Sequence, residues 1–119
     1  MTGPPLIDRT VIDDLFDYIG AEGTRSVLDL FIGESRTTLA TIAEAGTQGC
    51  DAACRERVRR AAHSLKSGAG QIGAAALAAL AEAVERAAAD GAPDLAQAAA
   101  SLQQCAEDTV AALAPFLSR

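Results

Sequence analysis

The chain has few aromatic residues: three Phe, one Tyr and no Trp among 119 residues. Half of its residues are nevertheless hydrophobic, so alanine and leucine must supply most of the core. Side chains of this kind favour helices and allow them to pack closely. We therefore expect an all-α protein. Its length fits one domain and leaves no room for a nucleotide-binding catalytic domain as well.

The chain also lacks a surplus of positive charge, because its formal net charge is -6. A protein that grips nucleic acid needs a basic surplus to neutralise phosphates, so nucleic acid is not expected as a partner. The Lys and Arg residues are nonetheless unevenly distributed. Half of them fall within one short segment, at Arg55, Arg57, Arg59, Arg60 and Lys66. This clustering predicts one cationic face.

Cysteines are few, and no long apolar run is present. Cys50, Cys54 and Cys105 form an odd set without CxxC spacing, which predicts reduced thiols that fill gaps in the core rather than disulfides or a metal site. No run approaches the roughly 20 apolar residues of a membrane span, and the start MTGPPLIDRT has no signal pattern. We expect a cytoplasmic protein without direct membrane binding, and nothing in the sequence requires more than a monomer.

Apolar residues recur at helical spacing from residue 10 onward, after a flexible lead of residues 1–9. A short helix capped by Thr10 or Asp13 is expected to end between Gly20 and Gly23. A longer helix should begin at Thr24 and be closed by two further glycines, Gly46 and Gly49.

Three more helices are expected in the second half of the chain. Asp51 is a plausible cap for the first of them, which carries an apolar seam in alternating steps of three and four: Val58, Ala62, Leu65, Ala69 and Ile72. The next covers about 74–89, and the last runs from Asp94 toward Leu117, with Pro115 expected to disturb or end its final turns. This pattern predicts an antiparallel up-and-down four-helix bundle with an additional short N-terminal helix packed across one end.

His63 is the only histidine, and it lies just off the apolar seam. Its neighbours on the helix surface, three, four or seven residues away, are cationic or small: Arg59, Arg60, Lys66, Ser67 and Gly70. A second protein could therefore bring a reactive group close to the imidazole, and Lys66 could stabilise an added dianion. Imidazole is a competent nucleophile in its neutral form, which suits a phosphoryl acceptor.

A helical hairpin that turns near Gly73 would bring Glu85 to the height of His63, because each helical residue rises about 1.5 Å. A carboxylate that accepts a hydrogen bond from Nδ1 would hold the tautomer whose Nε2 lone pair is free to attack. Register alone thus predicts that Glu85 orients the imidazole of His63.

The segment AAHSLKSGAGQIGA resembles the signature of histidine-containing phosphotransfer (HPt) domains, approximately His-x-Leu-Lys-Gly-x-Ser/Ala-x-x-apolar-Gly-Ala. The residues that match are His63, Leu65, Lys66, Ala69, Ile72, Gly73 and Ala74. Ser67 stands where the family commonly has glycine, and Gly68 where it often has serine. The family often has glutamine or glutamate at the position of Glu85. The resemblance extends over residues 10–119, which it identifies as an HPt bundle domain.

The resemblance implies a phosphotransfer carrier rather than an enzyme with ATP-dependent kinase activity. His63 would accept a phosphoryl group from a receiver-domain aspartate and pass it to another receiver, with Lys66 and Glu85 completing the site. The chain would need no cofactor, because the receiver supplies Mg²⁺. Its partners would be response-regulator receivers and a hybrid sensor histidine kinase. The chain could itself be the C-terminal domain of such a kinase, anchored in a membrane. The docking surface would comprise Arg59, Arg60, Ser67, Gly70, Gln71 and Leu15.

Two other functions compete with this interpretation. A helical adaptor or regulatory bundle could use its cationic face to bind an acidic protein while His63 stays unphosphorylated. The dimerising phosphoacceptor region of a sensor kinase is disfavoured, because there the histidine is followed by an acidic residue, whereas Ser64 follows His63. The Gly-rich ATP-binding boxes of such kinases are also missing from the sequence.

Overall fold

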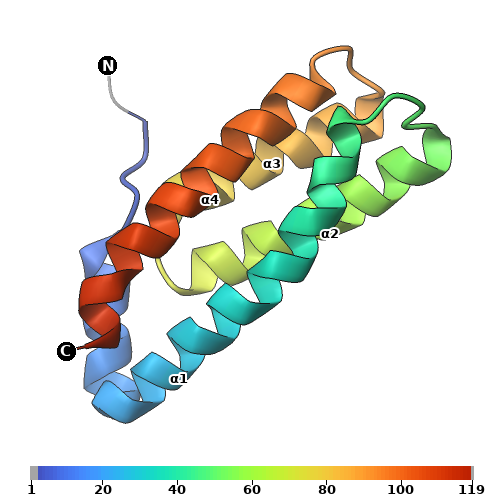
Figure 1. Ribbon diagram of the computed structural model, residues 1–119. Helices are drawn as coiled ribbons and strands as arrows, with labels where there is room; N and C mark the ends of the chain where they lie inside the picture. The colour runs from blue at the N-terminus through green and yellow to red at the C-terminus, as the bar shows by residue number, and fades with distance from the viewer. Residues whose placement is uncertain (1–2, 119) are drawn as a thin grey trace.

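The computed structural model describes residues 3–118 and consists of four α-helices and one short 3-10 helix. These are α1 (Arg9–Ala43), η1 (Glu44–Gly46), α2 (Ala52–Gln71), α3 (Ala75–Asp90) and α4 (Leu95–Leu117). Successive helices run antiparallel, side by side along one long bundle (Figure 1). The predicted all-α bundle is therefore confirmed. Residues 1, 2 and 119, which belong to the predicted lead and to the end of the predicted domain, lie outside the described residues.

The first helix is broken at Gly20, where φ is 76° and ψ is 177°. A positive φ of this kind suits a residue without a Cβ atom. The segment before the break lies across the end of the bundle beside the last turns of α4, and the segment after it runs along α2 (Figure 1). Arg9 stacks there over the ring of Phe116, 5.4 Å from its centroid. The predicted short helix across one end is thus present, as the first part of α1.

The cap of α1 differs from the predicted one. The helix begins at Arg9, because the Asp8 carboxylate accepts a 3.0 Å hydrogen bond from the N–H of Thr10. Asp is among the strongest N-cap residues, so it starts the helix ahead of the two predicted caps. The expectation that Thr10 or Asp13 caps this helix was wrong.

The turn between α2 and α3 is tied to the start of the chain. Asp8 N–H donates to the carbonyl of Gly73 at 2.7 Å, and Ala76 N–H donates to that of Pro5 at 2.9 Å. Gly73 has φ 80°, and a Cβ atom there would lie 2.8 Å from the Asp8 carbonyl oxygen and 2.9 Å from Cβ of Val11. Only glycine therefore fits this position. The hairpin predicted near Gly73 is confirmed.

The apolar seam predicted for α2 is buried along its whole length. Asp51 caps this helix as predicted, accepting a 2.9 Å hydrogen bond from the N–H of Cys54. Small residues are frequent among the buried positions of α2, α3 and the turn between them: Ala62, Ala69, Ala74, Ala81 and Ala88. Small side chains let two helix backbones approach closely, and this approach brings side chains on the outer edges of α2 and α3 within reach of each other.

The last helix runs on through Pro115 to Leu117. Pro115 is exposed, while Leu113 and Phe116 on either side of it are buried. Burial of these two side chains offsets the backbone hydrogen bond that proline cannot make, since a buried Leu or Phe contributes about 1.5–3 kcal/mol. Of the two effects expected of Pro115, disturbing or ending the last turns, the end of the helix does not occur. No described helix is long and apolar enough to cross a membrane.

Two of the cysteines are joined. Cys50 lies just before the cap of α2 and forms a disulfide with Cys54 in its first turn, with the two Cα atoms 5.1 Å apart. This separation lies within the range that a disulfide needs, so four-residue spacing at a helix start brings the thiols together. The expected reduced thiols at these positions were therefore wrong. Cys105 is free and buried, as a thiol that fills the core, and burial raises its pKa.

Candidate functional site

The imidazole of His63 projects from the middle of α2 into solvent, and its side chain is 61% exposed. The neighbouring Ala62 and Leu65 are turned into the core. Because the seam fixes the rotation of α2, His63 is held on the outer wall of the bundle and remains accessible to a second protein. This is the placement that the sequence predicted for the only histidine.

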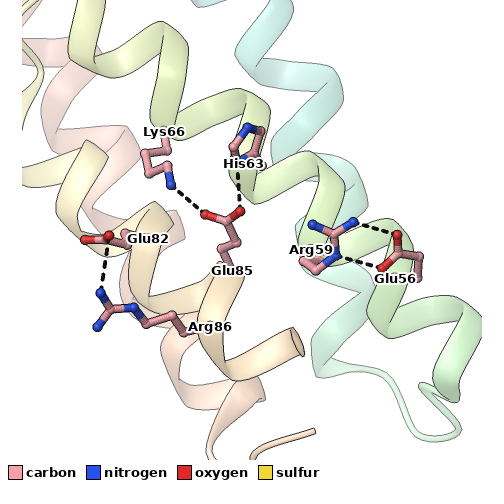
Figure 2. A network of polar contacts seen from close by, with 7 residues as sticks. All are labelled: Glu56, Arg59, His63, Lys66, Glu82, Glu85 and Arg86. Atoms are coloured by element: carbon pink, nitrogen blue, oxygen red, sulfur yellow. Dashed lines mark hydrogen bonds and ion pairs between the residues drawn. The ribbon is translucent and has the colours of Figure 1, made fainter. Parts of the chain in front are cut away.

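Glu85 reaches His63 from the neighbouring helix α3. Its Oε2 atom lies 2.7 Å from Nδ1 of His63 across the contact between the two helices (Figure 2). A carboxylate can only accept hydrogen bonds, so Nδ1 carries the proton and donates it. The second ring nitrogen, Nε2, lies on the side of the ring that faces away from Glu85 (Figure 2). The predicted contact is present, and it leaves the Nε2 lone pair open.

Lys66 binds the other oxygen of the same carboxylate. Its Nζ atom donates a 2.8 Å hydrogen bond to Oε1 of Glu85, one turn along α2 from His63. This bond is the largest cause that lowers the pKa of Glu85; burial of the carboxylate opposes it, and the bond from His63 adds to the lowering. Glu85 therefore stays ionised. One carboxylate thus positions both an imidazole and an ammonium group on α2.

Arg59 and Arg60 are both held by Glu56, one turn toward the start of α2. Arg59 makes two bonds of 2.7 Å to the two carboxylate oxygens, and Arg60 makes one of 2.9 Å. These two arginines lower the pKa of Glu56 to about 2. Sequence reasoning missed Glu56, although its spacing of three and four residues from the arginines was a usable signal. On the predicted cationic face, Arg59, Arg60 and Lys66 are thus each paired with a carboxylate.

A groove of about 120 Å³ lies between α1 and the last turns of α2. Gln71 lines it from α2, and Leu30, Phe31 and Glu34 line it from α1. Ser67 and Gly70 are exposed on the same helix and carry little side chain. The predicted docking residues of α2 thus share one helix surface with His63.

The predicted docking residue Leu15 does not line this groove. It is half-buried on the first segment of α1, which contributes nothing to the groove. The second segment of α1 was not expected here, but it lines the groove with Leu30, which is 62% exposed. Leu30 stands two residues after the buried Leu28 and therefore on another face of the helix, and this spacing was the available signal.

The arrangement provides a nucleophile, a group that orients it and nearby cations. Neutral imidazole with its Nδ1 proton held by a carboxylate has the properties of an activated nucleophile. Residues 3–118 contain no cluster of three or more His, Cys, Asp or Glu side chains placed to hold a metal ion. The chemistry that these residues support is the transient acceptance of an electrophilic group at Nε2.

Comparison with known proteins identifies the family. The model of the Hpt domain matches residues 26–116, which include His63, all of α2 and α3 and nearly all of α4. No curated protein and no solved structure matches the chain. The matched region covers most of the sequence, beginning shortly after the break at Gly20. The chain, with its exposed imidazole on a helical bundle, belongs to the Hpt domain family.

Proposed function

We propose that His63 is the phosphoacceptor of a phosphorelay, taking a phosphoryl group from the aspartyl phosphate of one receiver domain and passing it to another. Membership of the Hpt family implies histidine phosphotransfer. The observation that carries the assignment to His63 is its exposed ring, with Nδ1 bonded to Glu85 and Nε2 open to solvent. The relay can run in either direction, because both steps exchange one high-energy phosphoryl bond for another.

In this transfer one bond to phosphorus forms and another breaks, and His63 and Glu85 account for the change in charge. The Nε2 lone pair of His63 attacks phosphorus, an N–P bond forms, and the P–O bond to the receiver's aspartate breaks, so that the aspartate leaves as a carboxylate. The imidazole ring gains one positive charge, and the Nδ1 proton stays between the ring and Glu85. The Glu85 carboxylate stabilises this charged ring, as a carboxylate behind a histidine does in other nucleophilic sites.

The remaining residues would bind the receiver and compensate the charge of the phosphoryl group. Lys66 lies one turn from His63, where its ammonium group offsets the charge of the transferred phosphoryl group. A receiver would approach over the small residues Ser67 and Gly70 and the groove beside Gln71. Mg²⁺ would be supplied by the receiver. In this scheme the chain is a carrier that has no ATP-dependent kinase activity of its own.

The proposed partners are response-regulator receivers and a hybrid sensor histidine kinase. The chain would act in the cytoplasm as a monomer, either alone or within a membrane-anchored hybrid kinase. An acidic receiver surface around the aspartate would meet the side of α2 that carries Lys66 and the paired arginines Arg59 and Arg60.

Incubation with a panel of phosphorylated receivers tests the proposal. We expect label on the chain that is acid-labile and base-stable, and its loss in His63→Gln. Circular dichroism of the variant should be unchanged, because the exposed ring contributes little to the core. A chain that takes no label from any receiver would contradict the proposal and favour an adaptor that binds acidic proteins without phosphorylation.

A further inference from the structure

Arg59 and Arg60 each lie between two groups that can accept their hydrogen bonds. Glu56 is three residues before Arg59 and four before Arg60, while His63 is four residues after Arg59 and three after Arg60. Side chains three and four residues apart are neighbours on a helix surface. Both arginines are therefore within one helical turn of a carboxylate on one side and of the imidazole on the other.

In the unphosphorylated chain Glu56 holds both arginines. Figure 2 shows the Arg59 guanidinium group turned along α2 to Glu56 and away from His63. Helical side chains lean toward the helix N-terminus, which favours this arrangement. The imidazole, whose Nδ1–H donates to Glu85, carries no charge and therefore attracts the guanidinium groups less than a carboxylate does. Among the described residues, Glu56 is the carboxylate that holds both arginines by side-chain hydrogen bonds, and the charge of Glu85 adds only a smaller attraction on Arg59.

The described cations that lie three or four residues from His63 on α2 are all paired. Lys66 is bound to Glu85, and the two arginines are bound to Glu56. A phosphoryl dianion on Nε2 must therefore share one of these cations with its carboxylate or draw it away. Lys66 is the costlier choice, because Glu85 is only 17% exposed and also holds the imidazole. The Glu56 pairs are more exposed, with 43% for Glu56 and 74% for Arg60, so water can replace one partner.

We infer that Glu56 is a positioning residue that competes with phosphorylated His63 for Arg59 and Arg60, and thereby limits the stability of the phosphohistidine. This inference rests on the proposed function of His63. In the phosphorylated chain one or both guanidinium groups turn toward the phosphoryl oxygens, which accept bidentate hydrogen bonds from arginine. Glu56 then loses part of its pairing. The phosphoryl group is thus kept transferable instead of being trapped on the chain.

The substitution Glu56→Gln tests this competition, because it keeps the shape of the side chain and removes its charge. We expect the equilibrium between phosphorylated receiver and phosphorylated chain to shift toward the chain by about two- to fivefold, the range of one exposed ion pair. The shift should shrink in roughly 1 M salt, which screens exposed charges. In an Arg59→Ala/Arg60→Ala background, Glu56→Gln should have no effect.

Glu44→Gln is the matched control. Glu44 pairs with Arg57 at 2.8 Å in a similarly exposed Glu–Arg bridge, and the variant changes the net charge by the same amount. Arg57 lies six residues before His63 and therefore on another side of α2. We expect the wild-type equilibrium constant for Glu44→Gln. Circular dichroism of both variants should show the helical content of the wild type. This control distinguishes an effect of charge from a folding defect.

The outcomes separate this inference from the proposed function. Labelling of wild-type His63 together with equal equilibrium constants for Glu56→Gln and Glu44→Gln would overturn the inference and leave the relay function standing. A shift of Glu56→Gln toward the receiver, or the same shift in the double-arginine background, would also overturn it. Failure to label the wild-type chain would instead overturn the proposed function and the inference with it.

Discussion

Nδ1 of His63 lies 2.7 Å from Oε2 of Glu85, although 22 residues separate them along the chain. The contact exists because α2 and α3 pack closely over buried alanines and turn at a glycine that no other residue can replace. The same carboxylate also binds Lys66. The orientation of the imidazole thus depends on the fold of the hairpin, and variants that affect either should affect phosphotransfer.

Replacement of Glu85 should slow transfer to His63. We expect Glu85→Ala to lower the single-turnover rate from a phosphorylated receiver by about ten- to a hundredfold, the range found when an orienting partner of a histidine is removed. Glu85→Gln should lie between Ala and wild type, because the amide oxygen still accepts a hydrogen bond from Nδ1 but carries no charge. A wild-type rate for Glu85→Ala would show that the contact has no part in transfer.

Lys66→Ala removes the ammonium group that binds Glu85 one helical turn from His63, and it should slow transfer roughly tenfold, as expected for one charged hydrogen bond. Rates measured over a range of receiver concentrations would separate weaker docking from slower chemistry. Arg86→Ala is the control, because Arg86 is 76% exposed on α3 and pairs with Glu82 instead. Equal rates for the two variants would remove Lys66 from the site.

Acid should destabilise the fold partly through Glu56. Its pKa is about 2 in the folded chain against an ordinary value of 4.5, because Arg59 and Arg60 hold its charged form. A folded pKa below the unfolded one stabilises the protein above the unfolded pKa, and this contribution is lost as pH falls through the folded value. The Tm of wild type should therefore exceed that of Glu56→Gln at pH 7.

The same difference in Tm should shrink between about pH 5 and pH 2, because the Glu56 carboxyl of the unfolded chain becomes protonated there while that of the folded chain stays largely ionised. The pKa of Glu85 is lowered as well, chiefly by Lys66, so Glu85→Gln should follow the same trend. Thermal unfolding monitored by circular dichroism over this pH range provides the measurement. A Tm difference that stays constant down to pH 2 would contradict the assignment of the shift to Glu56.

Gly73→Ala should destabilise the protein by roughly 1–3 kcal/mol, because the new Cβ would strike the Asp8 carbonyl and the Val11 side chain. Gly33→Ala is the matched control within α1, where a Cβ meets nothing within 4 Å. It should stabilise the chain by about 0.5–1 kcal/mol, since alanine favours a helix interior over glycine. Urea unfolding of both variants gives the comparison; equal stabilities would rule out a special role of the turn.

The disulfide predicts the number of titratable thiols. Only Cys105 should react with a thiol reagent in the denatured, unreduced chain, whereas all three cysteines should react after reduction. Closing so short a loop stabilises the fold by about 2 kcal/mol in the chain-entropy account, so reduction should lower the Tm. Three reactive thiols without reduction would contradict the bridge and restore the interpretation based on the odd cysteine count.

The fold was predictable from the sequence because most of its determinants are local. The seam on α2, the Asp51 cap and the break near Gly20 all follow from residues within one or two helical turns. One misassignment arose where a local rule met a longer-range contact, because burial of Phe116 in the core holds the last turn of α4 beyond Pro115. The Asp8 cap is itself local, since its carboxylate bonds to the N–H of Thr10.

The sequence by itself determined that this is a helical hairpin bundle with one accessible histidine, because helix periodicity and turn residues act over short distances. It also brought Glu85 to the level of His63, since residue rise and turn position set the register. Only the tertiary structure decided that the Glu85 carboxylate serves Lys66 as well as His63. Rotamers and ion-pair partners depend on which side chains compete in space, and no pattern along the chain ranks those competitors.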